Sequence, residues 1–192
     1  MIEIRDARLT DAERLLEIYD YYVKNTATSF EYDTPSVEEF RNRMENVMKR
    51  YPYLVILKDN VIEGYAYAHA FVGREAYDWS CEMTIYLNHD ACKCGMGRKI
   101  YEAIEDILKK MGVTNLYACI GTTDVEDEYL NNNSANFHEH LGYVKVGEFN
   151  KCGYKFNRWY NMIWMEKIIG EYNSPKEKIK DYPSMLADDI IR

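Results

Sequence analysis

The sequence predicts one α/β domain in which a mixed sheet carries helices on its faces. Two observations give this prediction. Segments with apolar residues at every second position or in short runs, typical of strands, interleave with segments whose apolar residues recur at helical spacing. Their order along the 192 residues is β-α-α-β-β-β-α-β-α-β-β, which suits a layered domain with a short appendage.

A short strand over residues 2–5 and a helix are predicted at the start of the chain. Thr10 and Glu13 form a capping box, with Thr10 as the N-cap of the helix. The apolar residues of this helix recur at helical spacing and predict its buried stripe. They are Ala12, Leu15, Leu16, Tyr19 and Val23.

A second helix is predicted after Pro35, because Ser36 and Glu39 form another capping box. This helix is polar and runs to about Arg50. Its apolar stripe consists of Phe40, Met44 and Val47. The segment between the two helices, residues 26–34, is predicted to be a loop.

Three strands follow, over residues 53–57, 61–71 and 80–87. In the second of them, small residues share one face, so another element must approach that face closely. The small residues are Gly64, Ala66, Ala68 and Ala70, and the larger rings on the other face are Tyr65, Tyr67, His69 and Phe71.

The rest of the domain begins with a strongly amphipathic helix over residues 95–111, which Gly112 ends as a C-terminal cap. The further elements are a strand over 116–120, a short helix over 134–141 that Gly142 stops, and strands over 143–149 and 159–167. Beyond Gly170 the chain turns polar. Residues 1–170 are therefore the predicted domain, and 171–192 a C-terminal extension with one weak helical turn.

Composition and charge exclude several classes of protein. With 24 basic and 32 acidic residues the net charge is −8, whereas nucleic-acid binding depends on Lys and Arg that neutralise phosphates. The same charge argues against docking on an anionic membrane surface. The first residues lack the features of a signal peptide, and no stretch approaches the ~18 apolar residues of a membrane span. We therefore expect neither nucleic acid nor a membrane as a partner.

Five cysteines, an odd number without a second CxxC-type pair, favour reduced thiols in a cytoplasmic protein. The pair Cys92 and Cys94 has donor atoms for a soft metal, but structural zinc sites use four ligands at other spacings. The sequence therefore predicts a cytoplasmic location and no metal.

The strand over residues 80–87 separates polar from apolar side chains. Cys81, Met83, Ile85 and Leu87 share one face, and Ser80, Glu82, Thr84 and Tyr86 share the other. A strand inside a helix-covered sheet is normally apolar on both faces. Either this strand is a solvent-facing edge, or it forms a cleft wall in which Glu82 is a general base. Partial burial would raise the pKa of that carboxylate toward neutrality.

Gly95 and Gly97 lie between this strand and the long helix. Such glycines let backbone N–H groups approach a phosphate at the positive end of the helix dipole, although on their own they often mark only a turn. The pattern lacks the third glycine of a dinucleotide site and the Lys-Ser/Thr of a P-loop. A pyrophosphate ligand other than NAD or ATP is therefore the better inference.

These motifs resemble those of the GNAT-type N-acetyltransferases, and within them the phosphinothricin N-acetyltransferase group. The resemblance covers about residues 2–168 and is most specific in the run from Gly153 to Trp159. The other matching segments are Ile18-Tyr19, Thr26 to Glu31, Tyr51-Pro52, Gly64-Tyr65-Ala66, Arg74 to Trp79, Glu82 to Tyr86, Gly95 to Arg98, Ser134 to Gly142 and Gly147-Glu148-Phe149. The resemblance implies the GNAT acyltransferase fold, with a mixed, mostly antiparallel central sheet of about six to seven strands and helices on both faces.

The resemblance also implies acetyl-CoA as cosubstrate and assigns residues to it. The loop that would hold the pyrophosphate is Cys92, Lys93, Cys94, Gly95, Met96, Gly97 and Arg98, the strand that would bind the pantetheine arm is Ile85, Tyr86 and Leu87, and Asn131 and Ser134 would also contact the cofactor. The family usually has Arg or Gln, then Gly, at the positions of Cys92 and Lys93. The missing arginine removes a charge near the phosphates, for which Lys93 would compensate.

Two residues are implied to be catalytic. Glu82 matches the base that takes the proton of the substrate ammonium, directly or through water. His138 falls where many members carry a tyrosine that protonates the leaving thiolate, and where many phosphinothricin-type members have histidine. A cleft tyrosine such as Tyr86 is the other candidate donor. Without the resemblance, His138 reads more readily as a structural histidine beside Ser134 and Leu141.

Recognition of the acceptor is predicted on two loops. Arg74 offers a bidentate fork for a carboxylate and, with Tyr77, enters the cleft strand. The alternative is a surface ion pair for Arg74 and a packed ring for Tyr77. Phe30 and Glu31 would close the same pocket from the first long loop.

The sequence thus predicts an N-acetyltransferase that acts on the primary amine of a small amino-acid-like substrate, of the phosphinothricin or methionine sulfoximine type. Two alternatives stay open: another amine acceptor (a polyamine, an antibiotic or a protein N-terminus), or a non-catalytic acyl-CoA-binding module. Arg74 disfavours a polycationic acceptor, and Glu82 disfavours the module. A homodimer is also predicted, with the Lys155–Trp159 run as its contact, because apolar aromatic residues between strands often mark interfaces.

Overall fold

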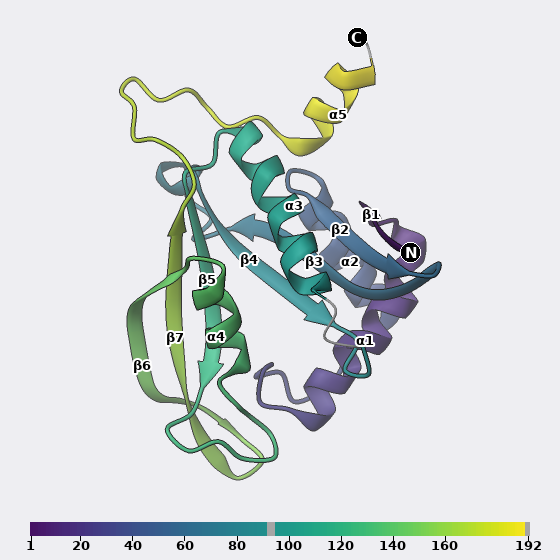
Figure 1. Ribbon diagram of the computed structural model, residues 1–192, viewed down its shortest axis with the longest axis vertical. Coiled ribbons are helices and arrows are strands. Elements are labelled where there is room, and N and C mark those ends of the chain that lie inside the picture. Colours follow the sequence, from purple (N-terminus) through teal and green to yellow (C-terminus); the bar gives the residue numbers. More distant parts are fainter. Residues whose placement is uncertain (92–94, 191–192) are drawn as a thin grey trace.

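A sheet of seven strands organises the part of the chain that the computed structural model describes, residues 1–91 and 95–190 (Figure 1). The strands are β1 (Ile2–Asp6), β2 (Tyr53–Lys58), β3 (Val61–Ala70), β4 (Ser80–Leu87), β5 (Asn115–Thr122), β6 (Val144–Lys155) and β7 (Arg158–Ile168). Their order in the sheet is β1-β2-β3-β4-β5-β7-β6, and among these described strands every neighbouring pair is antiparallel except β4 with β5. The mixed, mostly antiparallel sheet is confirmed.

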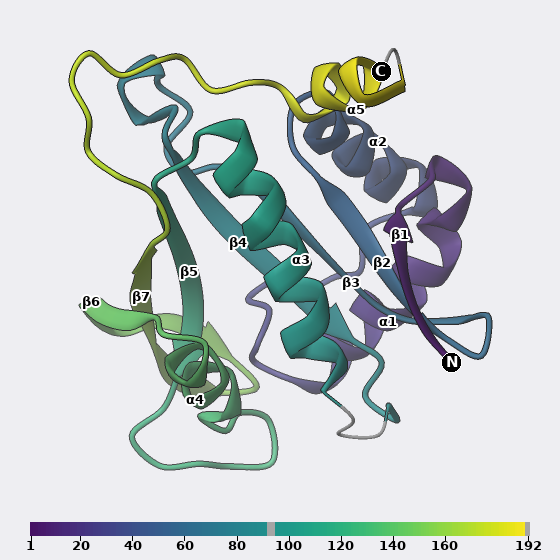
Figure 2. The same cartoon turned by 45° about the horizontal axis from the view of Figure 1, so that its top comes forward.

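Helices cover both faces of this sheet (Figure 2). α1 (Ala12–Asn25) and α2 (Val37–Met48) pack against one face, and α3 (Met96–Met111) and α4 (Asn133–His140) pack against the other. The other helical segments are η1 (Leu9–Asp11), η2 (Glu75–Tyr77) and α5 (Tyr182–Ile190). This layering confirms the predicted α/β class.

Small residues on β3 let α3 lie close to the sheet. Ala66 and Ala68 are fully buried in one cluster with Ile100 and Ile104 of α3. The other face of β3 carries Tyr65, which packs with residues of α1 and α2. The small-residue face expected from the alternation is therefore the face on which the long helix packs.

The predicted N-cap of α2 is confirmed, whereas that of α1 is wrong. Ser36 Oγ accepts a hydrogen bond from the Glu39 N–H at 3.1 Å. At the first helix, η1 precedes α1, and Asp11 is the residue at the N-cap. The Asp11 carboxylate accepts from the Arg8 N–H at 2.8 Å and closes the η1 turn. Because that turn occupies the start of the segment, Thr10 lies inside it rather than at the helix cap.

The C-terminal segment packs on the rest of the protein. Ile179 is buried in the cluster that contains α3, and Trp79 Nε1 donates a hydrogen bond to the Glu177 carbonyl at 2.7 Å. α5 has nine residues, which is more than the single weak turn that was predicted. The division into residues 1–170 and 171–192 stays a prediction.

β4 and β5 run side by side for three residues and then part. Their parallel pairing in the described chain joins Ser80–Glu82 to Asn115–Tyr117, although both strands continue well beyond it. β4 stays paired with β3 along its whole length, and β5 stays paired with β7. The sheet is therefore forked at its centre, immediately after Glu82.

The fork leaves backbone groups of β4 facing the gap. At the end of the β3–β4 ladder, the Asn88 N–H donates to the Glu63 carbonyl at 2.7 Å. Backbone groups alternate in direction along a strand, so the even-numbered residues of β4 face β3. Met83 and Ile85 consequently turn their N–H and C=O groups toward the gap, where the described part of β5 no longer pairs with them.

The close contact of β3 with β4 at Gly64 predicts a measurable packing penalty. A Cβ at this position would lie 2.8 Å from the Tyr86 carbonyl oxygen and 3.2 Å from the Leu87 Cα, which are backbone atoms that cannot turn away. Gly64→Ala is expected to lower the free energy of unfolding by about 1–3 kcal/mol in urea denaturation. Gly147→Ala is the control, since no described atom lies within 4 Å of its Cβ position. Equal stability of the two variants would contradict the packing argument.

Candidate active site

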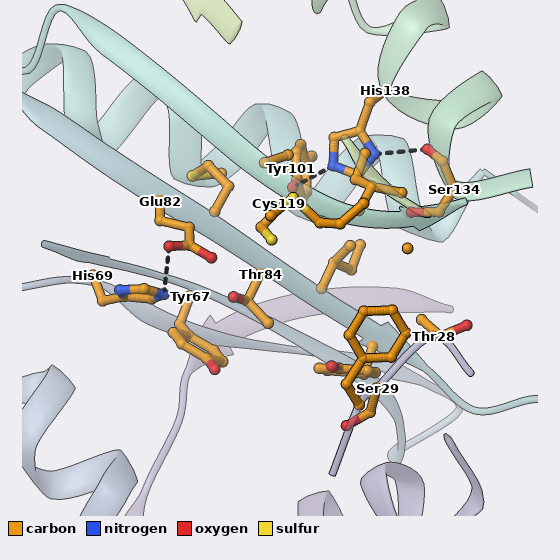
Figure 3. Close-up of a pocket in the computed structure, with 18 of the residues that line it drawn as sticks. Thr28, Ser29, Tyr67, His69, Glu82, Thr84, Tyr101, Cys119, Ser134 and His138 are labelled. Carbon is orange, nitrogen blue, oxygen red and sulfur yellow. Dashed lines mark hydrogen bonds and ion pairs between the residues drawn. The ribbon is translucent and has the colours of Figure 1, made fainter. Parts of the chain in front are cut away.

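A cavity of about 400 Å³ opens where β4 and β5 part (Figure 3). Its walls come from β3 to β7, from α3 and α4, and from the loop after α1. Among the predicted site residues, six line it: Phe30, Glu82, Ile85, Tyr86, Ser134 and His138. The fork thus brings together residues that are more than a hundred positions apart in the sequence.

Glu82 is the carboxylate of this cavity. It lies on β4 directly opposite His69 of β3, and its Oε2 is 3.8 Å from the His69 Nε2 (Figure 3). The Glu82 side chain is 21% exposed. Burial raises the pKa of the Glu82 carboxyl, and the facing His69 partly opposes that shift. The result is a carboxylate that is a stronger base than an ordinary surface glutamate.

His138 is held in one neutral form by two hydrogen bonds. Its Nδ1 is 2.7 Å from the Ser134 carbonyl, which can only accept, so Nδ1 carries the proton. Its Nε2 is 2.8 Å from the Tyr101 hydroxyl, which therefore donates to it (Figure 3). His138 is 3% exposed, and burial lowers its pKa, the bond to the Ser134 carbonyl opposing this in part. Proton donation by His138 stays a prediction. In this geometry its one ring proton is already donated to the Ser134 carbonyl.

Tyr101 is a cavity residue that the sequence analysis missed. It comes from α3, and burial keeps its pKa well above the ordinary value, so the hydroxyl stays protonated. Its position in the helix offered no signal, because a tyrosine beside an apolar stripe normally belongs to the core. His69 was also missed as a site residue, although it lies on the ring face predicted for its strand and faces Glu82 across the two strands.

Cys119 of β5 lies on the same side of the sheet as Glu82 and lines the cavity (Figure 3). Enclosure by the protein raises the pKa of its thiol to about 11, and the charge of Glu82 adds to this shift. The thiol is therefore protonated near neutral pH. A protonated thiol is a poor nucleophile.

The residues assigned to the pantetheine arm differ in their surroundings. Ile85 and Tyr86 line the cavity, whereas Leu87 lies beyond it. The Leu87 carbonyl accepts a hydrogen bond from the Tyr22 hydroxyl at 2.6 Å. This bond ties α1 to the end of β4 and removes one of the backbone groups that the sequence analysis assigned to the cosubstrate.

The segment at the start of α3 is described from Gly95 onward. Gly95 has a φ of 77°, and no described atom lies within 4 Å of the place where its Cβ would be, so its surroundings are open. Gly97 is packed instead, because a Cβ there would meet Phe137 at 3.1 Å, and Met96 is buried in the core. Arg98 is exposed, 3.8 Å from Glu102. Cys92, Lys93 and Cys94 lie outside the described residues.

Asn131 and Ser134, which were assigned together, lie in different places. Ser134 lines the cavity, and its carbonyl accepts a hydrogen bond from His138. Asn131 is exposed outside the cavity lining, and its Oδ1 accepts from the Asn133 N–H at 3.1 Å at the start of α4. A cofactor contact by Asn131 stays a prediction.

The predicted acceptor residues also divide. Phe30 lines the cavity, but Glu31 lies outside the lining, where it binds Arg43 at 2.8 Å and accepts from the Tyr19 hydroxyl at 3.1 Å. Arg74 and Tyr77 are exposed on the segment that joins β3 to β4, outside the cavity lining. No ion pair to the Arg74 guanidinium occurs within the described residues. Their role in acceptor binding stays a prediction.

In residues 1–91 and 95–190 no group of three or more His, Cys, Asp or Glu side chains is arranged to hold a metal ion. Within the same residues, none of the helices combines the length and the apolar character that a membrane crossing requires.

Residues 4–164 match the family model of the acetyltransferase (GNAT) domain, so the chain belongs to the GNAT family. The protein is therefore a GNAT acetyltransferase, in agreement with the resemblance noted from its motifs. The described fold, a mixed sheet forked between β4 and β5, agrees with that family assignment.

Similar proteins narrow the group within this family. The chain is 30% identical over 166 residues to the phosphinothricin N-acetyltransferase of Streptomyces viridochromogenes, covering 86% of this chain and 87% of the relative. It is 27% identical over 175 residues to the L-amino acid N-acyltransferase MnaT of Escherichia coli, covering 91% and 98%. A crystal structure of a phosphinothricin acetyltransferase from Sinorhizobium meliloti in complex with acetyl-CoA superposes with a TM-score of 0.84 at 29% identity, covering 95% and 96%. The chain thus falls in the phosphinothricin acetyltransferase-like group.

The raised pKa of Glu82 predicts a pH-dependent stability difference. A carboxyl whose folded-state pKa is raised stabilises the fold while it is protonated, and that contribution is lost as the pH rises through the folded-state pKa. Glu82→Gln cannot ionise. Relative to the wild type, its free energy of unfolding is therefore expected to increase steadily from about pH 4.5, the ordinary pKa of a glutamate, toward neutral pH.

Urea denaturation at a series of pH values measures this difference. Glu139→Gln, at an exposed position of α4, is the matched control for the loss of one carboxylate. A flat difference for Glu82→Gln would mean that burial does not penalise the Glu82 charge.

Proposed function

We propose that this protein transfers the acetyl group of acetyl-CoA to the primary amine of a small amino-acid-like substrate. The observation that carries the proposal is Glu82, a partly buried carboxylate in a cavity at the fork of the sheet. The names of the relatives support the acceptor class: they are acetyl- or acyltransferases of phosphinothricin, of L-amino acids and, in a relative from Salmonella typhimurium at 26% identity, of L-methionine sulfoximine, and each of these acceptors carries an α-amino group.

The fork suits an extended cosubstrate that carries amide groups. Met83 and Ile85 turn their backbone N–H and C=O groups toward the gap, where an amide chain can pair with them as an added strand would. Gly95, with its open surroundings, begins α3 at the same end of β4, and the described first turn of α3 contains no acidic residue. Backbone N–H groups at such a helix start favour a phosphate group. When bound, acetyl-CoA supplies the activated acetyl group.

The residues of the cavity supply the remaining steps of the proposed reaction. Glu82 accepts a proton from the substrate ammonium, because only the neutral amine can attack a thioester. Of the backbone N–H groups of Met83 and Ile85, one that is not paired with the amide chain of the cosubstrate is the donor for the oxygen on which negative charge develops. We assign the protonation of the leaving thiolate to the Tyr101 hydroxyl, which stays protonated and is hydrogen-bonded to His138. We assign His138 the task of orienting that hydroxyl.

Three finer proposals concern the oligomeric state, the location and the partners of the protein. Tyr154 and Trp159 are exposed on the β6–β7 hairpin with ring centroids 4.9 Å apart, which supports a homodimer contact there. Cys81, Cys119 and Cys152 are free thiols, which supports the reducing environment of the cytoplasm. The net charge of −8 supports a small-molecule acceptor over nucleic acid.

A thiol-release assay with acetyl-CoA and a panel of amines tests the proposal. The panel contains α-amino acids, methionine sulfoximine, phosphinothricin, polyamines and the decarboxylated amine of each amino acid. We expect an α-amino acid or analogue to have the highest kcat/KM. Arg74→Ala is expected to raise the KM of that acceptor, with a loss of up to ~3 kcal/mol for a charge-assisted bond, and to leave its decarboxylated amine unaffected.

The other outcomes of this assay discriminate between the alternatives. A wild-type preference for the decarboxylated amine would contradict an amino-acid acceptor and favour a polyamine or a protein N-terminus. Binding of acetyl-CoA without thiol release from any amine would favour a non-catalytic acyl-CoA-binding module. Equal losses for both acceptors in Arg74→Ala would remove Arg74 from carboxylate recognition.

A further inference from the structure

Lys155, at the end of β6, is a buried lysine whose ammonium is fully engaged with backbone. The residue is 3% exposed. Its Nζ donates to the Val23 carbonyl at 2.7 Å, to the Thr26 carbonyl at 2.8 Å and to the Ser29 carbonyl at 2.7 Å. An ammonium has three N–H donors, and each of them has a partner. Lys155 therefore joins β6 to three points of a segment more than 120 residues earlier in the chain.

The three carbonyls belong to the C-terminal turn of α1 and to the loop that follows it, residues 26–31. A helix C-terminus carries partial negative charge, so a cation is favoured there. Burial lowers the pKa of the Lys155 ammonium, and the charge of Glu31 opposes that shift. Other bonds also hold the loop: the Ala27 N–H donates to the Tyr129 carbonyl at 3.0 Å, Ser29 Oγ lies 2.8 Å from the Tyr19 hydroxyl, and Glu31 binds Arg43.

This loop forms one wall of the catalytic cavity. Thr28, Ser29 and Phe30 all line it, and Figure 3 shows Thr28 and Ser29 across the cavity from Glu82. Phe30 lies directly over Gly153 of β6, where a Cβ would approach its ring to 2.4 Å. One residue separates Gly153 from Lys155, so the same short stretch of β6 both supports Phe30 and fixes the backbone of its loop.

The wall lies on the side of the sheet from which the acceptor must approach. Ala118 and Ile120 of β5 are buried against the cluster of α3, so the alternate residue Cys119 points to the opposite side. Cys119 lines the cavity together with Glu82 and Phe30. An amine that gives its proton to Glu82 consequently meets this side of the cavity, and with it the loop.

We propose that Lys155 is a positioning residue for the acceptor: its ammonium fixes residues 26–31 so that Phe30 forms the acceptor wall of the cavity opposite Glu82. The proposal rests on the proposed function, because the loop is an acceptor wall only if the cavity binds an acceptor. It does not depend on the chemical class of that acceptor. The proposal gives Lys155 no role in binding acetyl-CoA. Among the described residues, its ammonium has hydrogen bonds to residues 23, 26 and 29 and none to β4 or α3.

The direct test is Lys155→Met, which keeps the length of the side chain and removes the ammonium. Steady-state kinetics use the best acceptor from the amine panel, whatever its class. The acceptor KM is expected to rise at least about tenfold, since hydrogen bonds to a charged group are lost. The KM of acetyl-CoA is expected to stay within about twofold, because the three hydrogen bonds of Lys155 go to residues 23–29 and none goes to β4. Lys110→Met, an exposed lysine near the end of α3, is the control and should change neither constant.

A double-mutant cycle with Phe30→Ala tests whether Lys155 acts through the loop. Phe30→Ala leaves the three bonds of Lys155 in place and should raise the acceptor KM by itself. In its background, Lys155→Met should add little, because the wall that Lys155 positions is already gone. Additive effects, or equal rises of the acceptor and acetyl-CoA constants, would overturn the proposal and leave Lys155 a residue of the fold alone.

Amide hydrogen exchange of residues 27–31 provides a readout that needs no acceptor. Lys155→Met should accelerate exchange there and leave α3 unchanged, and unchanged exchange in the loop would overturn the proposal. This result stands even if no amine is acetylated, so it separates a failure here from a failure of the proposed function. Should Lys155→Met not fold, Lys155→Arg keeps the charge but cannot direct three N–H groups at the same carbonyls. Its acceptor KM should still rise, and wild-type constants would overturn the proposal.

Discussion

The parting of β4 from β5 is the constraint on which the rest of the structure depends. Each strand keeps its outer neighbour, β3 or β7, along its whole length, so the two halves of the sheet are individually complete. They are joined in the described chain by three residues of parallel pairing. Everything needed at the site follows from this geometry: backbone groups left free on β4, a cavity between the halves, and Glu82 at the last paired position.

Lys155 and Glu82, two charged groups near the cavity, differ in how completely neighbouring groups satisfy their charge. Lys155 has a partner for each of its N–H donors, and all three are fixed backbone carbonyls. Among the described residues, the carboxylate of Glu82 has an ion-pair contact only with the His69 ring, at 3.8 Å. Burying an ion is costly unless hydrogen bonds satisfy its charge, so an incompletely satisfied ion is expected at a functional site. The contrast supports the proposed positioning by Lys155 and the proposed proton transfer by Glu82.

Much of the fold could be predicted from the sequence because its signals are local. Alternation, helical periodicity and the cap at Ser36 are properties of a few neighbouring residues, and each was confirmed. β6 was predicted too short because the ladder shifts register between Phe149 and Gly153, and Lys151 in that stretch has a positive φ that resembles a turn. Such a bulge depends on the partner strand β7, which a local pattern does not contain.

The site could be predicted only in part, since its geometry joins distant segments. Glu82 stood out because a polar face on a central strand is unusual. Tyr101 could not be found in this way, because its contact with His138 depends on how α3 and α4 pack. The three carbonyls that bind Lys155 are backbone atoms and leave no mark in the sequence. Residue identity therefore suggested the base, whereas its surroundings required the structure.

The central claim, that Glu82 at the fork takes the proton of the amine, is tested most directly by the pH dependence of kcat/KM. Wild type and Glu82→Gln are compared with the same acceptor, whose own titration is common to both. The account predicts a fall of ~100- to 10,000-fold at neutral pH for Glu82→Gln, loss of the wild-type rise that follows ionisation of Glu82, and an unchanged Kd for acetyl-CoA. A variant that keeps most of its turnover and the same pH dependence would contradict it.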